Sequence, residues 1–228
     1  MAISYNPRIV TDGLVLCLDA GNAKSYSGSG TTWTDLIGNG NNGTLVNGVG
    51  YSGSNGGSLS FDGVDDYVDL TSTIQFDTGD FSISGWFRSN SGNTNFKQIW
   101  NSGYNGGNPD VEITINQTTN ILNFYVRPGS SAQTSYSVDD NVWRYFVGVK
   151  TSSLISLYVN GSFVSSTSGT FTSDVDSIGV VPRIGNGLNG ISNRPFKGNI
   201  AQVSIYNKAL TASEIQQNFN ATRSRFGI

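Results

Sequence analysis

The 228-residue sequence contains no histidine, a single cysteine and few charged residues. Without histidine, the chain can form no Ser-His-Asp triad, no histidine-ligated zinc site and no imidazole proton shuttle. Cys17 cannot form an intrachain disulfide, and its place in an apolar run indicates a small core residue. Charged residues make up 13% of the chain, against about 25% in an average globular protein. These absences exclude several classes of enzyme and metal centre.

Positive charge is also sparse. The 13 Lys and Arg residues are scattered, and 16 Asp and Glu residues outnumber them. Nucleic-acid binding needs a basic patch that neutralises phosphates, so we expect no nucleic-acid partner. No apolar stretch has the length of a signal peptide or of a membrane span, so we expect no membrane partner.

Short runs of alternating apolar and polar residues recur along the chain, separated by Gly, Asn and Ser. Alternation with a period of two is typical of half-buried strands. Phe81 and Ile83, for example, share one face, while Ser82 and Ser84 share the other. Many such strands predict an all-β sandwich of two antiparallel sheets. We expect strands at residues 14–18, 58–61, 67–70, 81–87, 98–101, 111–116, 121–126, 143–150, 154–159, 163–166, 181–184 and 200–206.

Two local signals stand out between these strands and near the C-terminus. Asn160-Gly161 lies between apolar runs and predicts a hairpin turn in which both residues take positive φ. A helix is expected at residues 211–219, because Thr211 and Glu214 have the spacing of a capping box.

Seven segments follow one another along most of the chain: GLVLCLDAGN (13–22), WTDLIGNGNNGT (33–44), LSFDGVDDYV (59–68), FSISGW (81–86), WRYFVGV (143–149), LYVNG (157–161) and GNIAQVSIYNKALTASEI (198–215). In this order they resemble the laminin-G-like group of concanavalin-A-like lectin/glucanase domains. The resemblance implies a jelly-roll sandwich of two antiparallel sheets with one short C-terminal helix. We expect an N-terminal arm at 1–12, a laminin-G-like domain at 13–222 and a C-terminal tail at 223–228.

The opening block, residues 19–22 followed by residues 28–35, is most similar to versions of the domain in structural proteins of tailed bacteriophages. This narrower resemblance implies a non-enzymatic virion protein, either a capsid decoration or a tail component. Its partners would be other virion proteins, with the arm and the tail as docking elements, and it would form a homo-oligomer. The alternative is a free carbohydrate-binding lectin module.

The resemblance also implies a calcium ion at the sandwich edge, because family members often hold one there. Calcium takes several oxygen ligands, and the loop at 35–43 offers Asp35, Asn39 and Asn41. Gln202 is the fourth candidate, although related sequences carry Asp-Glu where this chain has Ala201-Gln202. Alternatively, these residues form turns held by hydrogen bonds from side chain to backbone.

A second acidic group at Asp62, Asp65 and Asp66 is either a cation site or a hairpin turned by Gly63. If the chain is extended there, the adjacent carboxylates of Asp65 and Asp66 point to opposite sides and make a poor chelate. We therefore expect a structural role for this loop.

Hydrolysis of a glycosidic bond needs two carboxyl groups facing one another across a sugar. Glu214 belongs to the expected capping box, so Glu112 is the only other glutamate. Asp110 would share a strand face with Glu112, but no third acid follows where the related glucanases carry one. We therefore expect no enzymatic activity.

Sugar binding without catalysis is a further expectation, because lectin sites combine aromatic faces with Asn and Asp side chains. Trp33, Trp86 and Trp143 occupy positions that the resemblance assigns to the core. The loop at 100–108 is rich in aromatic, Gly and Asn residues and has the composition of a lectin loop. The candidate glycan-binding residues are Trp100, Tyr104, Asn105 and Asn108.

Overall fold

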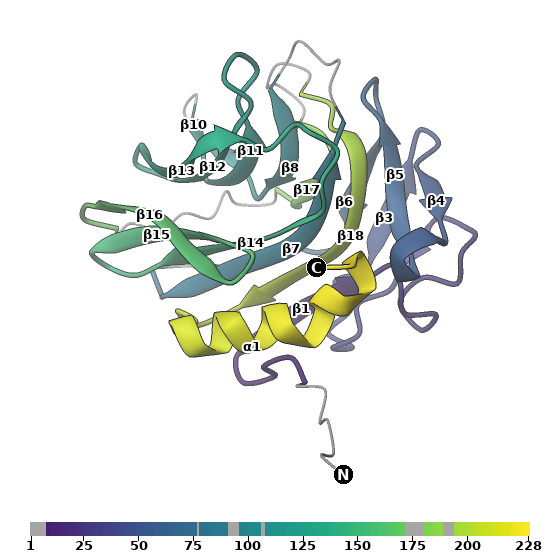
Figure 1. Ribbon diagram of the computed structural model, residues 1–228, viewed down its shortest axis with the longest axis horizontal. Helices are drawn as coiled ribbons and strands as arrows, with labels where there is room; N and C mark the ends of the chain where they lie inside the picture. The colour runs from purple at the N-terminus through teal and green to yellow at the C-terminus, as the bar shows by residue number, and fades with distance from the viewer. Residues whose placement is uncertain (1–7, 77, 91–95, 106–107, 172–179, 189–193) are drawn as a thin grey trace.

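The computed structural model describes residues 8–76, 78–90, 96–105, 108–171, 180–188 and 194–228. In this part of the chain, two eight-stranded antiparallel sheets stack on one another, and a C-terminal helix covers one of them (Figure 1). The architecture confirms the predicted all-β sandwich. No helix among these residues is long and apolar enough to cross a membrane.

The first sheet has the strand order β16-β15-β14-β7-β18-β5-β4, and β1 also pairs with β18. Asn160 and Gly161 connect β15 to β16 with φ angles of 51° and 78°, which confirms the predicted turn. The strands of the first sheet are β1 (Leu14–Asp19), β4 (Gly50–Ser52), β5 (Ser58–Asp62), β7 (Phe81–Ser89), β14 (Arg144–Lys150), β15 (Leu154–Val159), β16 (Ser162–Ser168) and β18 (Lys197–Tyr206).

The second sheet has the order β13-β12-β11-β8-β17-β6-β3-β2. A separate two-stranded ribbon consists of β9 (Tyr104–Asn105) and β10 (Asn108–Pro109), and a short 3-10 helix, η1, spans Ser54–Gly56. The strands of the second sheet are β2 (Thr32–Trp33), β3 (Gly43–Val46), β6 (Tyr67–Leu70), β8 (Lys97–Asn101), β11 (Val111–Ile115), β12 (Ile121–Val126), β13 (Ser130–Ser137) and β17 (Arg183–Ile184).

The main hydrophobic core lies between the two sheets and is built largely from alternate residues of the strands. In β11, Val111, Ile113 and Ile115 are fully buried in it. Trp33 belongs to the same core, as expected. Cys17 is also buried, and burial raises the pKa of its thiol to about 11, so the thiol stays protonated at neutral pH.

A second core fills the space between the first sheet and the C-terminal helix α1 (Ala212–Thr222). Thr211 and Glu214 form the predicted capping box at the start of this helix. Trp86 and Trp143 pack in this core, which confirms their structural role. The 3-10 helix η2 (Arg223–Phe226) follows directly and packs into the same core through Phe226.

The first described residues after the N-terminus also join this second core. Val10 packs in it; its backbone N–H donates to Asn218 Oδ1 at 2.7 Å, and its carbonyl accepts from the Tyr206 hydroxyl at 3.0 Å. This end of the expected arm therefore packs against the helix.

Candidate functional site

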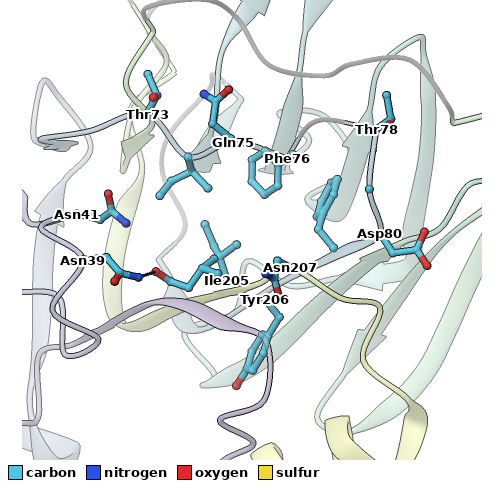
Figure 2. Close-up of a pocket in the computed structure, with 14 residues that line it drawn as sticks. Asn39, Asn41, Thr73, Gln75, Phe76, Thr78, Asp80, Ile205, Tyr206 and Asn207 are labelled. Carbon is cyan, nitrogen blue, oxygen red and sulfur yellow. Dashed lines mark hydrogen bonds between the residues drawn. The ribbon is translucent and has the colours of Figure 1, made fainter.

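A pocket of about 510 Å³ opens where the β2–β3 and β6–β7 connections meet the end of β18 (Figure 2). This volume is within the usual range of small-molecule sites, about 300–1,000 Å³. The lining residues come from segments far apart in the sequence: Val15, Asn39, Asn41, residues 73–76, residues 78–81 and residues 205–207.

Hydrogen bonds to β1 fix the wall that carries Asn39 and Asn41. Asp35 Oδ1 accepts from the backbone N–H of Cys17 at 3.0 Å, and Asn39 Nδ2 donates to the carbonyl of Val15 at 3.3 Å. Val15 is the extra residue of a β-bulge in the β1–β18 pairing, an irregularity of the kind that re-aims a side chain. The bulge and the loop therefore shape this wall together.

Lys150 lies behind the opposite wall, which residues 78–81 form, and hydrogen-bonds to its backbone. Its buried Nζ donates to the carbonyls of Thr78 at 2.9 Å and Gly79 at 2.7 Å. Burial lowers the pKa of Lys150, and the nearby carboxylate of Asp80 opposes this shift. The buried ammonium group of Lys150 thus fixes the backbone of Thr78 and Gly79. These two residues directly precede Asp80, which lies at the rim of the pocket.

The floor of the pocket is apolar. Ile74, Phe76, Phe81 and Ile205 line it, and all four belong to the main core. The rings of Phe76 and Phe81 are 4.4 Å apart between centroids. A floor of this kind can accept the C–H groups of a ligand and exclude water from them.

The rim is polar and carries unused hydrogen-bonding groups. In the part of the chain that the structure describes, the side chains of Asn41, Gln75 and Asn207 make no hydrogen bond. Figure 2 shows Asn39 and Asn41 on one side of the pocket and Asp80 on the other. Each side-chain amide offers both donors and an acceptor, so the rim suits a ligand with many hydroxyl groups.

The structure corrects the expectation for Trp100. Its side chain is fully buried in the main core, so its ring cannot stack on a sugar. Tyr104, Asn105 and Asn108 lie in the β9–β10 ribbon, where Asn105 pairs with Asn108. Their assignment to a glycan site stays a prediction.

The residues expected to bind calcium are not brought together. Asn39 contacts Val15 near the start of β1, whereas Gln202 pairs with Asp19 at the end of this strand. Four residues of strand separate these points by roughly 13 Å, while calcium ligands lie about 2.3–2.6 Å from the ion. Asp35 Oδ1 is occupied by two backbone N–H groups. Asp35, Asn39, Asn41 and Gln202 therefore do not form one coordination shell, which corrects that expectation.

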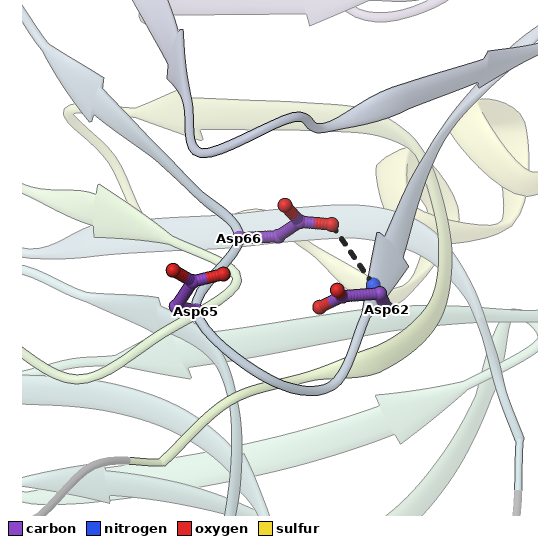
Figure 3. A group of neighbouring side chains, drawn as sticks. All are labelled: Asp62, Asp65 and Asp66. Atoms are coloured by element: carbon purple, nitrogen blue, oxygen red, sulfur yellow. Dashed lines mark hydrogen bonds between the residues drawn. The ribbon is translucent and has the colours of Figure 1, made fainter.

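A different acidic group could hold a metal ion. One carboxylate oxygen each from Asp62, Asp65 and Asp66 lie within 4.8 Å of one another (Figure 3). The loop bends between β5 and β6, so the expected divergence of Asp65 and Asp66 in an extended chain is corrected.

Asp66 is the buried member of this group. Its Oδ2 accepts from the backbone N–H of Asp62 at 2.9 Å. Burial raises the pKa of Asp66, the hydrogen bond from Asp62 opposes the shift, and the charges of Asp62 and Asp65 add to it.

Glu112 lies on the face of the second sheet that points away from the main core. Its Oε1 accepts from Asn101 Nδ2 at 3.1 Å and from Arg194 Nη1 at 2.9 Å. Burial raises its pKa to about 7 and outweighs the opposing attraction of Arg194. Asp110 precedes β11, and its carboxylate pairs with Arg127 Nε at 3.1 Å. The nearby acid is thus already engaged in an ion pair.

With this geometry in place, sequence comparison identifies the class of protein. A family profile described as the concanavalin A-like lectin/glucanases superfamily matches residues 61–216, more than half of the chain. The chain belongs to this superfamily. No curated protein matches it in sequence.

Solved structures share the fold at low sequence identity. The binding domain of Paraclostridial Mosquitocidal Protein 1 superposes with a TM-score of 0.71 and 22% identity, over 92% of this chain and 52% of that chain. Domain 4 of AbnA, a GH43 extracellular arabinanase from Geobacillus stearothermophilus solved with arabinotriose, gives 0.66 and 19%, over 90% and 97%. Trypanosoma rangeli sialidase with sialic acid gives 0.69 and 16%, over 97% and 36%.

The share of each solved chain that this protein covers differs. It spans about half of the solved binding-domain chain of the mosquitocidal protein and about a third of the sialidase chain. It matches nearly the whole of the arabinanase domain. At these identities, the similarity shows the fold alone.

The sequence does not predict most of the pocket. It marks Asn39 and Asn41, but as metal ligands, and it marks neither Gln75 nor Asp80 nor Asn207. Their common feature is a polar residue in a connection between strands or directly beside a strand. That feature is shared by most loops of this chain, so it does not separate a site from a turn.

Proposed function

We propose that this protein is a non-catalytic carbohydrate-binding module and that the pocket at the end of the sandwich is its glycan site. The observation that carries the proposal is the combination of an apolar floor with unengaged side-chain amides on the rim. A sugar ring presents C–H groups on its faces and hydroxyl groups around its edge, so both surfaces find partners.

The related structures support this assignment. The arabinanase domain was solved with arabinotriose, and the sialidase was solved with sialic acid. The arabinanase domain shares the fold of this chain over nearly its whole length, and the sialidase shares it over about a third of its own chain. The free carbohydrate-binding module, which the sequence offered as an alternative, is therefore the better supported function.

A glycan panel followed by isothermal titration tests the proposal. We expect at least one oligosaccharide to bind, and Asn41→Ala and Asn207→Ala each to raise its Kd by about 3–10-fold, the value of one lost hydrogen bond. Neither amide supports the described fold through a side-chain hydrogen bond, so both variants should keep the wild-type Tm.

Asn220→Ala is the matched control, because it removes an amide from α1, outside the pocket. Its Kd should equal that of the wild type. If no glycan binds, or if all three variants lose affinity equally, the pocket is not the glycan site.

We also propose that binding occurs without hydrolysis. The carboxylate of Asp110 is paired with Arg127, so among the described residues this nearby acid is not free to act with Glu112. Wild type and Glu112→Gln should both be inert on a panel of glucans. Turnover by the wild type that Glu112→Gln abolishes would contradict this.

The place of the protein in a phage particle and its oligomeric state stay predictions from the sequence. Mass spectrometry of purified particles would find the chain at high copy number if it is a virion protein. A glycan site of the kind proposed here is compatible with either a virion or a free module.

A further inference from the structure

The described lining of the pocket carries a single charge, and this charge is negative. Among the lining residues that the structure describes, Asp80 is the only charged side chain, and it is exposed at the rim. Lys150 lies behind the wall, where its Nζ is taken up by the carbonyls of Thr78 and Gly79. Among the described lining residues, a ligand in the pocket therefore meets one carboxylate and no available cation.

We propose that the pocket selects neutral sugars and rejects carboxylated ones such as sialic acid or galacturonic acid. The inference rests on the proposed function and names the substrate class of that site.

Acidic and neutral sugars differ in the carboxylate group, which has to find partners in the pocket. A carboxylate removed from water needs a cation or several N–H donors, and proteins use Arg or Lys for this purpose. Here it would lie near Asp80, whose like charge repels it in a partly enclosed site.

Hydroxyl groups fit the same rim. Each hydroxyl both donates and accepts, as do the amides of Asn41, Gln75 and Asn207. Asp80 can accept a hydrogen bond from a hydroxyl as well. A hydroxyl can therefore use the amides and Asp80 alike, whereas a carboxylate can only accept from the amides, gains nothing from Asp80 and is repelled by it.

Matched pairs of oligosaccharides test the proposal on the full chain. Isothermal titration would compare lactose with sialyllactose and galactotriose with trigalacturonic acid, at pH 7.5 and low salt. We expect the neutral member of any pair that binds to do so at least tenfold more tightly. Salt should change its Kd less than twofold, because no ion pair forms.

Two charge reversals locate the selectivity. Asp80→Lys should narrow or invert the preference. Asp12→Lys changes the net charge equally at a site outside the pocket, where Asp12 is 83% exposed, and should leave the preference intact.

Acidic sugars that bind as tightly as their neutral partners would overturn the inference and leave the proposed function standing. A preference that Asp80→Lys does not change would also overturn it. Absence of binding by every glycan would remove the proposed function and this inference together.

Discussion

The indole ring of Trp86 and the phenyl ring of Phe226 stack on one another, with centroids 4.1 Å apart and planes 22° from parallel. Phe226 also packs against Trp143, at 4.7 Å between centroids. Next to it, Arg225 forms two hydrogen bonds of 2.9 Å with the carboxylate of Asp19. Phe226, in the expected C-terminal tail, is thus part of the second core.

Phe226→Ala should therefore lower the free energy of unfolding by about 3 kcal/mol, as expected for removing a buried aromatic ring. Urea denaturation followed by tryptophan fluorescence would measure it, since both contacting rings are indoles. Ile228→Ala is the control: this side chain is 41% exposed, and its loss should cost less than about 0.5 kcal/mol. A Phe226→Ala variant as stable as wild type would instead point to a tail that is free to dock elsewhere.

Alternation of apolar and polar residues was enough to place much of the sandwich. The strands β6, β12 and β15 have the bounds that their period-two patterns predict. The strand β13 (Ser130–Ser137) was not predicted, because it consists mostly of Ser, Gln and Thr and only Ala132 and Thr134 are buried. An edge strand of small polar residues has the composition of a loop.

The misplacement of Trp100 has a specific structural cause. The register of β8 against β11 shifts at Ile99, so Ile99 and Trp100, adjacent in sequence, both enter the main core. A bulge of this kind breaks the period of two. The pocket escaped prediction for a related reason: Asn41, Asp80 and Asn207 become neighbours only through strand pairing over long sequence distances.

Glu112 makes the stability of the protein depend on pH. Its folded-state pKa of about 7 lies above the ordinary value of 4.5, so the folded state holds the proton more tightly than the unfolded state. Stability contributed by this group is therefore present below pH 4.5 and is lost as the pH rises to 7. The full effect is at most about 3 kcal/mol.

Glu112→Gln removes this titration and keeps a carbonyl oxygen for Asn101 and Arg194. We expect the variant to gain stability relative to wild type as the pH rises from 4.5 to 7. Urea denaturation at a series of pH values measures the difference. A constant difference across this window would show that burial does not perturb Glu112.

The carboxylates of Asp62, Asp65 and Asp66 provide a test with metal ions. Their mutual proximity makes negative charge costly there, and a divalent cation would relieve that cost. We expect millimolar Ca²⁺ to raise the Tm of wild type above its value in EDTA, and Asp65→Asn to reduce this rise. An equal rise in both would place the ion elsewhere, and no rise would leave these residues as a turn.

Lys150 links the pocket to the rest of the fold and supplies the most direct test of how the site is built. Lys150→Met keeps most of the length of the side chain but leaves the carbonyls of Thr78 and Gly79 without their donor. Because these residues form one wall, we expect Lys150→Met to weaken glycan binding about tenfold, while Lys150→Arg keeps part of the affinity through its own N–H groups. Titration of the glycan that binds wild type, together with Tm for each variant, separates a loosened wall from general unfolding. Unchanged affinity in Lys150→Met would mean that the wall keeps its shape without the buried cation.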